Sequence, residues 1–155
     1  MFHFFKKKNI EIYSPVKGEV IELAEVNDPV FSQKMMGEGF AVIPSDSIVY
    51  SPVAGTIKSI FPTNHAISIH SSHGLDVLLH VGIDTVTLKG KGLYPKVTVG
   101  QKVAIDDELL TMDVQYLKEQ EKENTIIVVF PEVKDKSYSI FTGFKEPGEK
   151  VMAIQ

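Results

Sequence analysis

One motif, S-P-V-x-G-x-[VI], occurs twice in this chain, at residues 14–20 and again 37 residues later at 51–57. Its proline restricts φ at the approach to a bend, and its glycine permits the tight bend itself. Each copy is therefore typical of a turn that leads into a strand. Two copies predict two similar β-units related by an approximate symmetry.

Runs of β-branched and other apolar residues recur along the chain, separated by Gly, Pro, Asn and Asp. The runs are residues 10–13, 19–23, 40–43, 56–61, 66–70, 75–81, 108–112 and 125–130. Their spacing is typical of an all-β sandwich or barrel. Residues 114–122 instead predict a helix, with Asp113 as its N-cap and Asn124 just beyond its end. We therefore expect an all-β fold with one or two short surface helices.

The composition excludes several classes of function. The 155 residues fit one domain, and a hydrophobic fraction of 43% is enough to fill its core. Cysteine is absent, which excludes disulfides, thiolate metal sites and cysteine nucleophiles and fits a reducing cytoplasm. The net charge of −4 provides no basic field for nucleic acid, so no nucleic-acid partner is expected. No apolar run reaches the length of about 18 residues that a membrane span needs.

Residues 1–9 are expected to form a flexible segment ahead of a domain of residues 10–155. The segment places its aromatic residues before Lys6, Lys7 and Lys8, which is unlike the order in a signal peptide. Aromatic residues beside lysines could touch an anionic membrane surface, but so short a segment is more often a solvated chain end. We therefore expect a cytoplasmic protein with at most a peripheral membrane contact.

The repeated turn resembles the flattened, duplicated sandwich of several protein families, among them biotinyl and lipoyl carriers, glucose-type enzyme IIA domains and LytM-type metallopeptidases. A biotinyl or lipoyl carrier needs a lysine before the second turn, where this chain has Pro44. A LytM-type peptidase needs an H-x-H pair, which the five histidines do not provide. His70 and His73 are interpreted as part of a solvated turn rather than as metal ligands.

Two other histidines, His65 and His80, lie in more specific motifs. Residues 74–86 read G-L-D-V-L-L-H-V-G-I-D-T-V, and residues 61–66 read F-P-T-N-H-A. Both segments, together with the D-P-V-F…G-E-G loop of residues 28–39, resemble motifs of the glucose-type enzyme IIA domain of the bacterial phosphoenolpyruvate-dependent sugar phosphotransferase system. The first matches the family signature at every position. The likeness covers roughly residues 10–154 and implies the family's duplicated hybrid motif.

The resemblance implies that His80 is the phosphorylated nucleophile, at its Nε2 atom, and that the Gly82 carbonyl holds its Nδ1 proton. Taken alone, a histidine in such an apolar run is more often an ordinary buried strand residue. Strand alternation, however, places His80 on the face opposite Leu79 and Val81, where it could reach a partner. With an unperturbed pKa of about 6.5, much of a histidine is neutral at cytoplasmic pH and needs no separate base.

The same resemblance assigns a supporting role to His65. This residue would donate a hydrogen bond to the phosphoryl group during transfer, and Thr63 would orient it. Two facing imidazoles, those of His65 and His80, could also bind zinc if a partner supplied a third ligand. Acceptance of phosphate requires neither a metal nor a cofactor.

Phosphoryl exchange requires two proteins to dock in turn over one histidine, and the family surrounds its site with exposed apolar residues. The matching positions here are Val30, Met35, Met36, Phe61, Leu78 and Val86. Methionine side chains adapt to different partner surfaces. Asp28 and Asp84 stand where the family has acidic residues beside this patch, and they are expected to contact partners.

The resemblance therefore predicts a phosphotransferase component with a covalent phosphohistidine intermediate. It would accept a phosphoryl group from phospho-HPr on His80 and pass it to the cysteine of a sugar-specific enzyme IIB, which serves a membrane IIC permease during sugar uptake. The alternative is a regulatory binding module of the same fold, whose phosphorylation state switches protein partners. Onward transfer to a IIB domain would separate the two.

Overall fold

The two copies of the repeated motif exchange backbone hydrogen bonds. In the computed structural model, which describes residues 9–134 and 137–155, Tyr13 N–H donates to the Pro52 carbonyl (3.1 Å) and Tyr50 N–H donates to the Pro15 carbonyl (2.6 Å). The buried serine that opens each copy donates to the carbonyl of the valine two residues later. These matching contacts relate the two β-units by the approximate symmetry that the repeat predicts.

Strands dominate the chain, as the spacing of the apolar runs predicts. The strands are β1 (Ile10–Tyr13), β2 (Gly18–Glu22), β3 (Glu38–Pro44), β4 (Ile48–Tyr50), β5 (Gly55–Ile60), β6 (Ala66–Ser71), β7 (Asp76–Val81), β8 (Leu93–Pro95), β9 (Lys102–Val103), β10 (Glu108–Met112), β11 (Ile126–Phe130), β12 (Tyr138–Ile140), β13 (Gly143–Lys145) and β14 (Lys150–Ile154). Two short α-helices, α1 (Pro29–Ser32) and α2 (Val114–Glu119), and the 3-10 turns η1 (Leu23–Glu25) and η2 (Thr85–Leu88) complete the elements.

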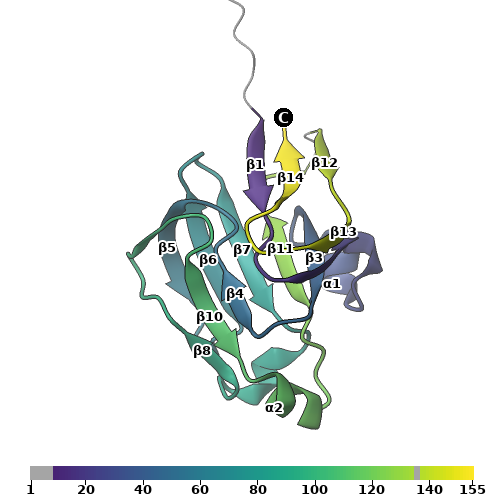
Figure 1. The fold of residues 1–155 in the computed structure, drawn as a ribbon, viewed down its shortest axis with the longest axis vertical. Helices are drawn as coiled ribbons and strands as arrows, with labels where there is room; N and C mark the ends of the chain where they lie inside the picture. Colours follow the sequence, from purple (N-terminus) through teal and green to yellow (C-terminus); the bar gives the residue numbers. More distant parts are fainter. Residues whose placement is uncertain (1–8, 135–136) are drawn as a thin grey trace, which may run out of the picture.

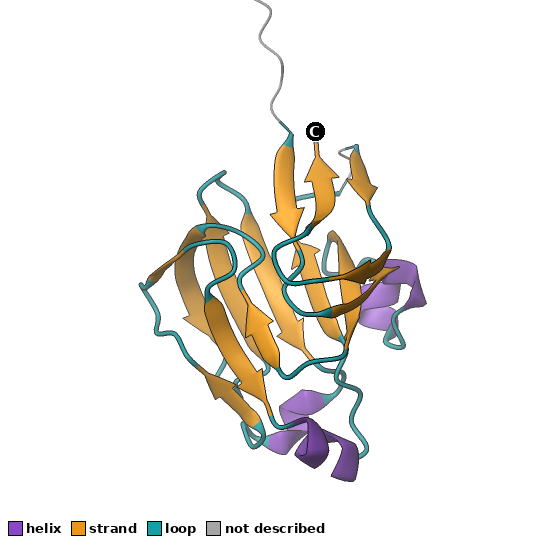
Figure 2. Cartoon of the chain, in the orientation of Figure 1, coloured by secondary structure: helices purple, strands orange, loops and turns teal. Residues whose placement is uncertain are grey.

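The strands form one large antiparallel sheet and two small ones (Figures 1 and 2). The large sheet has the order β13-β2-β3-β11-β7-β6-β5-β9, and the small sheets have the orders β4-β10-β8 and β1-β14-β12. Residues of β4, β8 and β10 share a core with residues of β5, β6 and β7, so the sheets stack face to face. The all-β sandwich prediction is confirmed, and the sheets are not closed into a barrel.

A second, smaller core covers the opposite face of the large sheet beside β3 and β11. There the segment of η1 and α1 packs onto the sheet. The cluster consists of Leu23, Val26, Phe31, Ala41, Ile127 and Val129. Strand β11 is therefore buried on both faces, which explains why all its residues are apolar. In β7, Val77, Leu79 and Val81 point into the main core, as the alternation predicts, and His80 points to the face where α1 lies.

The helix boundaries follow from capping. Asp113 accepts a hydrogen bond from Tyr116 N–H (3.0 Å) at the start of α2, as expected of an N-cap. The helix ends at Glu119, before the predicted end, because Glu121 adopts a left-handed φ of 57°. The Lys122 N–H then donates to the Leu117 carbonyl, which terminates the helix as a Schellman motif does.

No helix within residues 9–134 and 137–155 is long and apolar enough to cross a membrane.

The predicted flexible segment, residues 1–9, lies outside the described residues except for Asn9. Each predicted apolar run overlaps a strand, and the sequence patterns miss β4, β8, β9 and the three strands β12, β13 and β14 near the C-terminus. These strands have between two and five residues, too few for alternation to distinguish most of them from loops.

Candidate functional site

Antiparallel pairing of β6 with β7 brings His65 and His80 together. His80 lies near the end of β7 opposite Ala66, the first residue of β6, and the Val81 N–H donates to the His65 carbonyl (2.7 Å). The two imidazole rings meet edge to face, with their centroids 5.2 Å apart. The two motifs that the sequence singles out therefore supply one shared site.

The Nδ1 atom of His80 forms a hydrogen bond with the backbone. It lies 2.7 Å from the carbonyl oxygen of Gly82, and because a carbonyl can only accept, Nδ1 carries the proton. A neutral His80 consequently has an unprotonated Nε2 with a free lone pair. The Phe31 ring packs against the imidazole at a centroid distance of 4.8 Å, so His80 is half-buried.

The surroundings of His80 favour its neutral form. Burial, followed by the neighbouring His65, lowers the pKa of His80 to about 4, although the Gly82 carbonyl and Asp28 both act in the opposite direction. At neutral pH the side chain therefore presents a nucleophilic nitrogen without first having to lose a proton.

Gly82 adopts a backbone conformation that favours glycine over other residues. Its φ is +77°, and a Cβ there would lie 2.4 Å from Thr85 Cγ2 and 2.9 Å from the Glu123 carbonyl oxygen. Its N–H donates to the Thr125 carbonyl (2.8 Å), which ties it to the residues just before β11. The N–H of Gly82 thus anchors the same residue whose carbonyl accepts from His80.

His65 is oriented by the turn that precedes β6. Its Nδ1 forms a hydrogen bond with the Thr63 hydroxyl, and the Phe61 ring lies edge-on at a centroid distance of 5.3 Å. Asn64, at a left-handed φ of 58°, shapes this turn and donates its amide to the Leu93 carbonyl (3.2 Å). Burial lowers the pKa of His65, which favours the neutral form of this ring. When the Thr63 hydroxyl donates, Nε2 of His65 carries the proton and can donate to a group on His80.

Exposed apolar side chains flank the histidine pair on several segments. Those predicted from the sequence and exposed in the structure are Val30, Met35, Met36, Phe61 and Val86. Leu78 differs, because it is half-buried and packs against the second core. Val30 belongs to α1, whose Phe31 touches His80, and Val86 belongs to η2, which begins soon after Gly82. Helix α1 thus contacts the His80 ring, and Phe61 contacts the His65 ring.

The two acidic residues have different surroundings. Asp28 caps α1 by accepting the Val30 N–H (2.9 Å), and its charge acts on His80. Asp84 is exposed and forms an ion pair with Lys122, whose Nζ lies 3.0 Å from Oδ2. Sequence reasoning missed both Lys122 and the contact of Phe31 with His80, although Phe31 stands in a recognised motif. No local signal connects Lys122 with a residue 38 positions earlier.

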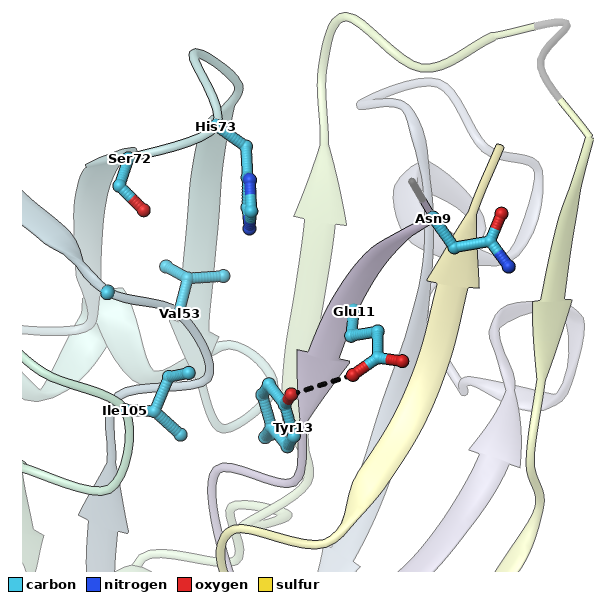
Figure 3. Close-up of a pocket in the computed structure, with 8 residues that line it drawn as sticks. Asn9, Glu11, Tyr13, Val53, Ser72, His73 and Ile105 are labelled. Carbon is cyan, nitrogen blue, oxygen red and sulfur yellow. Dashed lines mark hydrogen bonds between the residues drawn. The ribbon is translucent and has the colours of Figure 1, made fainter. Parts of the chain in front are cut away.

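Among the described residues the histidine pair is not part of a larger cluster of metal-binding side chains, and it does not line the pocket in Figure 3. Within residues 9–134 and 137–155, no group of three or more His, Cys, Asp or Glu side chains could hold a metal ion. Zinc at His65 and His80 would therefore need a further ligand from outside the described residues. A cavity of about 510 Å³ lies instead between β1 and the turn from β6 to β7 (Figure 3). There the Tyr13 hydroxyl donates to Glu11 (2.9 Å), and His73 stands across from them.

Comparison with known proteins gives consistent matches. The family described as "phosphoenolpyruvate-dependent sugar phosphotransferase system, EIIA 1" matches residues 10–136. A glucose-specific EIIA component of Buchnera aphidicola is 42% identical over 146 residues, which cover 90% of this chain and 91% of that protein. A glucose-specific EIICBA component of Streptococcus pneumoniae is 49% identical over 126 residues, 81% of this chain but 17% of the length of that larger relative. The solved structure of glucose permease IIA from Mycoplasma capricolum superposes with a TM-score of 0.88 at 35% identity, covering 97% of this chain and 99% of the other.

Proposed function

The chain belongs to the EIIA 1 family of the phosphoenolpyruvate-dependent sugar phosphotransferase system, and from this premise we propose that its domain of residues 10–155 carries a phosphoryl group on His80. The donor is phospho-HPr, and the acceptor is the cysteine of a sugar-specific enzyme IIB. The reaction takes place in the cytoplasm and serves sugar uptake.

Both transfers are direct displacements at phosphorus. In the first, the Nε2 lone pair of His80 attacks, the new N–P bond forms, and the N–P bond to the donor histidine breaks as its imidazole leaves. In the second, a cysteine thiolate attacks, the P–S bond forms and His80 departs as a neutral imidazole. Nδ1–H stays on the Gly82 carbonyl in both steps, so no proton has to move on the His80 ring.

A single observation carries this proposal: the hydrogen bond from His80 Nδ1 to the Gly82 carbonyl. It determines which ring nitrogen is free, and the low pKa of about 4 keeps that nitrogen unprotonated at pH 7. A histidine with these two properties can attack phosphorus without a general base.

His65 is proposed to stabilise the phosphoryl group. Its ring lies close enough to His80 for Nε2–H to donate to a phosphoryl oxygen, and Thr63 holds its other nitrogen. As negative charge shifts during transfer, this donor would bind the transition state more strongly than the resting phosphohistidine.

The exposed apolar residues and the acidic pair are proposed to receive both partners. Val30, Met35, Met36, Phe61 and Val86 are exposed, Leu78 is half-buried, and methionine side chains adapt to different partner surfaces. A single surface that accepts donor and acceptor in turn suits a carrier. The name of the Streptococcus pneumoniae relative joins EIIA to EIIB and EIIC, which supports those domains as partners.

The proposal is tested by incubating the chain with enzyme I, HPr and phosphoenolpyruvate and measuring its intact mass. We expect a gain of one phosphoryl group, which acid removes because N–P bonds are acid-labile. His80→Ala should gain none while keeping its circular dichroism spectrum, and His73→Ala, which changes an exposed histidine elsewhere, should be labelled normally. Labelling of the His80→Ala protein would disprove the assignment.

A further inference from the structure

Basic and acidic residues are segregated along this chain. Residues 85–105 contain Lys89, Lys91, Lys96 and Lys102 but none of the 20 Asp and Glu residues. The rest of the chain contains the other 12 of the 16 basic residues and all 20 acidic residues, so its net charge is −8. The net charge of this segment is +4. An acidic protein thus carries a locally basic stretch in addition to Lys6, Lys7 and Lys8 near its start.

The four lysines lie at the surface, and the Lys91 ammonium stands over the Tyr116 ring, 5.5 Å from its centroid. All of them are exposed, and none has its ammonium group within 4.0 Å of a carboxylate in the part of the chain that the structure describes. Four other lysines do make such contacts, including Lys58 and Lys122. The charge of the segment is therefore not compensated by ion pairs within the described fold.

The segment follows an open edge of the molecule. Strands β8 and β9 are each the last strand of a sheet, and the connection between them projects from the left edge in Figures 1 and 2. The Gly100 N–H donates to the Ile57 carbonyl (2.8 Å), and the Ile57 N–H donates to the Gln101 carbonyl (2.9 Å). These bonds anchor the connection to β5, so it is held in place.

Apolar side chains stand between the lysines. Val97 is buried and anchors the connection, whereas Val99 is 62% exposed and lies between Lys96 and Lys102 in sequence. Tyr94 on β8 is 50% exposed. We call Tyr94, Lys96, Val99 and Lys102, on β8, β9 and the connection between them, the basic edge.

We propose that the basic edge binds an anionic lipid bilayer. Lysine ammonium groups reach lipid phosphates while their methylene chains lie along apolar surface, and tyrosine prefers the interface between headgroups and acyl chains. An exposed aliphatic side chain between such lysines can enter the headgroup region. No carboxylate stands within residues 85–105, between Asp84 and Asp106, so the repulsion from an anionic surface is weaker here than along the rest of this acidic chain.

The shape of the basic edge favours a bilayer over an acidic protein. A projecting turn needs a complementary groove in a folded partner, whereas a soft planar surface can receive it without one. Each lysine near an anionic membrane contributes about fivefold to the partition coefficient, the equivalent of about 1 kcal/mol, so the contact is weak and reversible. Weak attachment would concentrate the carrier beside a membrane-bound acceptor, a use that rests on the proposed function although the lipid binding itself does not.

Vesicle co-sedimentation of the full chain tests the charges. The protein should bind phosphatidylcholine vesicles that contain phosphatidylglycerol and not vesicles of phosphatidylcholine alone, and high salt should release it. Lys96→Gln with Lys102→Gln should lower the partition coefficient by about 25-fold. Lys118→Gln with Lys150→Gln gives the same net charge from lysines outside the basic edge and should change it little. Equal losses in both pairs, or none in the first, would overturn the proposal.

A fluorescent reporter tests the location, because the chain contains no tryptophan. In Val99→Trp, anionic vesicles should shift the emission to shorter wavelength, and in Phe144→Trp, whose position on β13 is 59% exposed, they should not. Vesicle binding without a shift in Val99→Trp would place the contact elsewhere in the chain and disprove the proposal. A shift with soluble polyglutamate but not with vesicles would indicate an acidic protein partner instead. His80→Ala should bind vesicles normally, which separates this test from that of phosphoryl transfer.

Discussion

The imidazole rings of His65 and His80 meet edge to face, with their centroids 5.2 Å apart and their planes at 73°. Each ring has its Nδ1 held by a residue two positions away in the chain, Thr63 for His65 and Gly82 for His80. The Nε2 atoms are therefore the free ring nitrogens, and in the proposed transfer that of His80 attacks phosphorus while that of His65 donates to a phosphoryl oxygen.

His65→Gln should accept phosphate from HPr but donate it slowly to enzyme IIB. Glutamine can hydrogen-bond the phosphoryl group, yet it cannot carry a proton or a positive charge as the group leaves. Loss of one charge-stabilising donor typically costs about 10²- to 10³-fold in rate. Stopped-flow transfer from the phosphorylated variant to a IIB domain measures this, and an unchanged rate would make His65 a bystander.

Gly82→Ala should destabilise the protein and disturb the tautomer of His80. The new Cβ would clash with Thr85 Cγ2 and the Glu123 carbonyl, in addition to the strain of a positive φ. Strain of this kind costs about 1–3 kcal/mol. Gly74→Ala is the matched control, since its φ is +87° but nothing lies within 4 Å of the position that its Cβ would take. Thermal unfolding of both variants should show the larger loss for Gly82→Ala, and equal losses would leave no role for the clash.

The free energy of unfolding should fall as the pH is lowered from about 6.5 to about 4. Burial and His65 lower the pKa of folded His80 to about 4, while the unfolded chain titrates near 6.5, so between these values the unfolded state binds more protons. The full stabilisation is present above pH 6.5, and its loss for this group amounts to about 3 kcal/mol.

Urea unfolding at several pH values measures this dependence. His80→Gln cannot titrate, so its free energy of unfolding should depend less steeply on pH over the same window. His65 acts in the same direction, because burial also lowers its pKa, and some dependence should remain in that variant. Identical slopes for the wild type and His80→Gln would contradict a lowered pKa at His80.

Removal of the two acidic charges beside the site should slow association with HPr at low salt. Asp28→Asn keeps the cap of α1, and the defect of Asp28→Asn with Asp84→Asn should shrink at about 0.5 M salt, where charges are screened within a few Å. Lys122→Gln should act in the opposite direction, because it frees Asp84 from its ion pair.

Met36→Asp provides the contrast to these charge variants. It places a carboxylate among the exposed apolar residues, so its defect should persist at high salt and lie mostly in the lifetime of the complex. Exchange rates across a salt series distinguish the two behaviours. If neither the asparagine pair nor Met36→Asp changes the rate, the docking surface lies elsewhere.

Much of the fold could be predicted because its signals are local. The proline and glycine of each repeated motif determine a bend within a few residues, and the apolar runs that become β1 and β10 coincide with those strands. The helix start at Asp113 follows from a side-chain cap three residues from its partner. Short strands such as β8 and β9 were missed because pairing with a neighbour, and not their own pattern, makes them strands.

The sequence by itself determined which residues are candidates for the chemistry: two histidine motifs, an acidic loop and a glycine two positions after His80. Only the tertiary structure decided their environment. Antiparallel pairing sets the distance between His65 and His80, and the packing of Phe31 against His80 contributes to the burial that lowers its pKa. Desolvation and long-range contacts such as Lys122 with Asp84 depend on atoms far apart in the chain, so no local pattern could have revealed them.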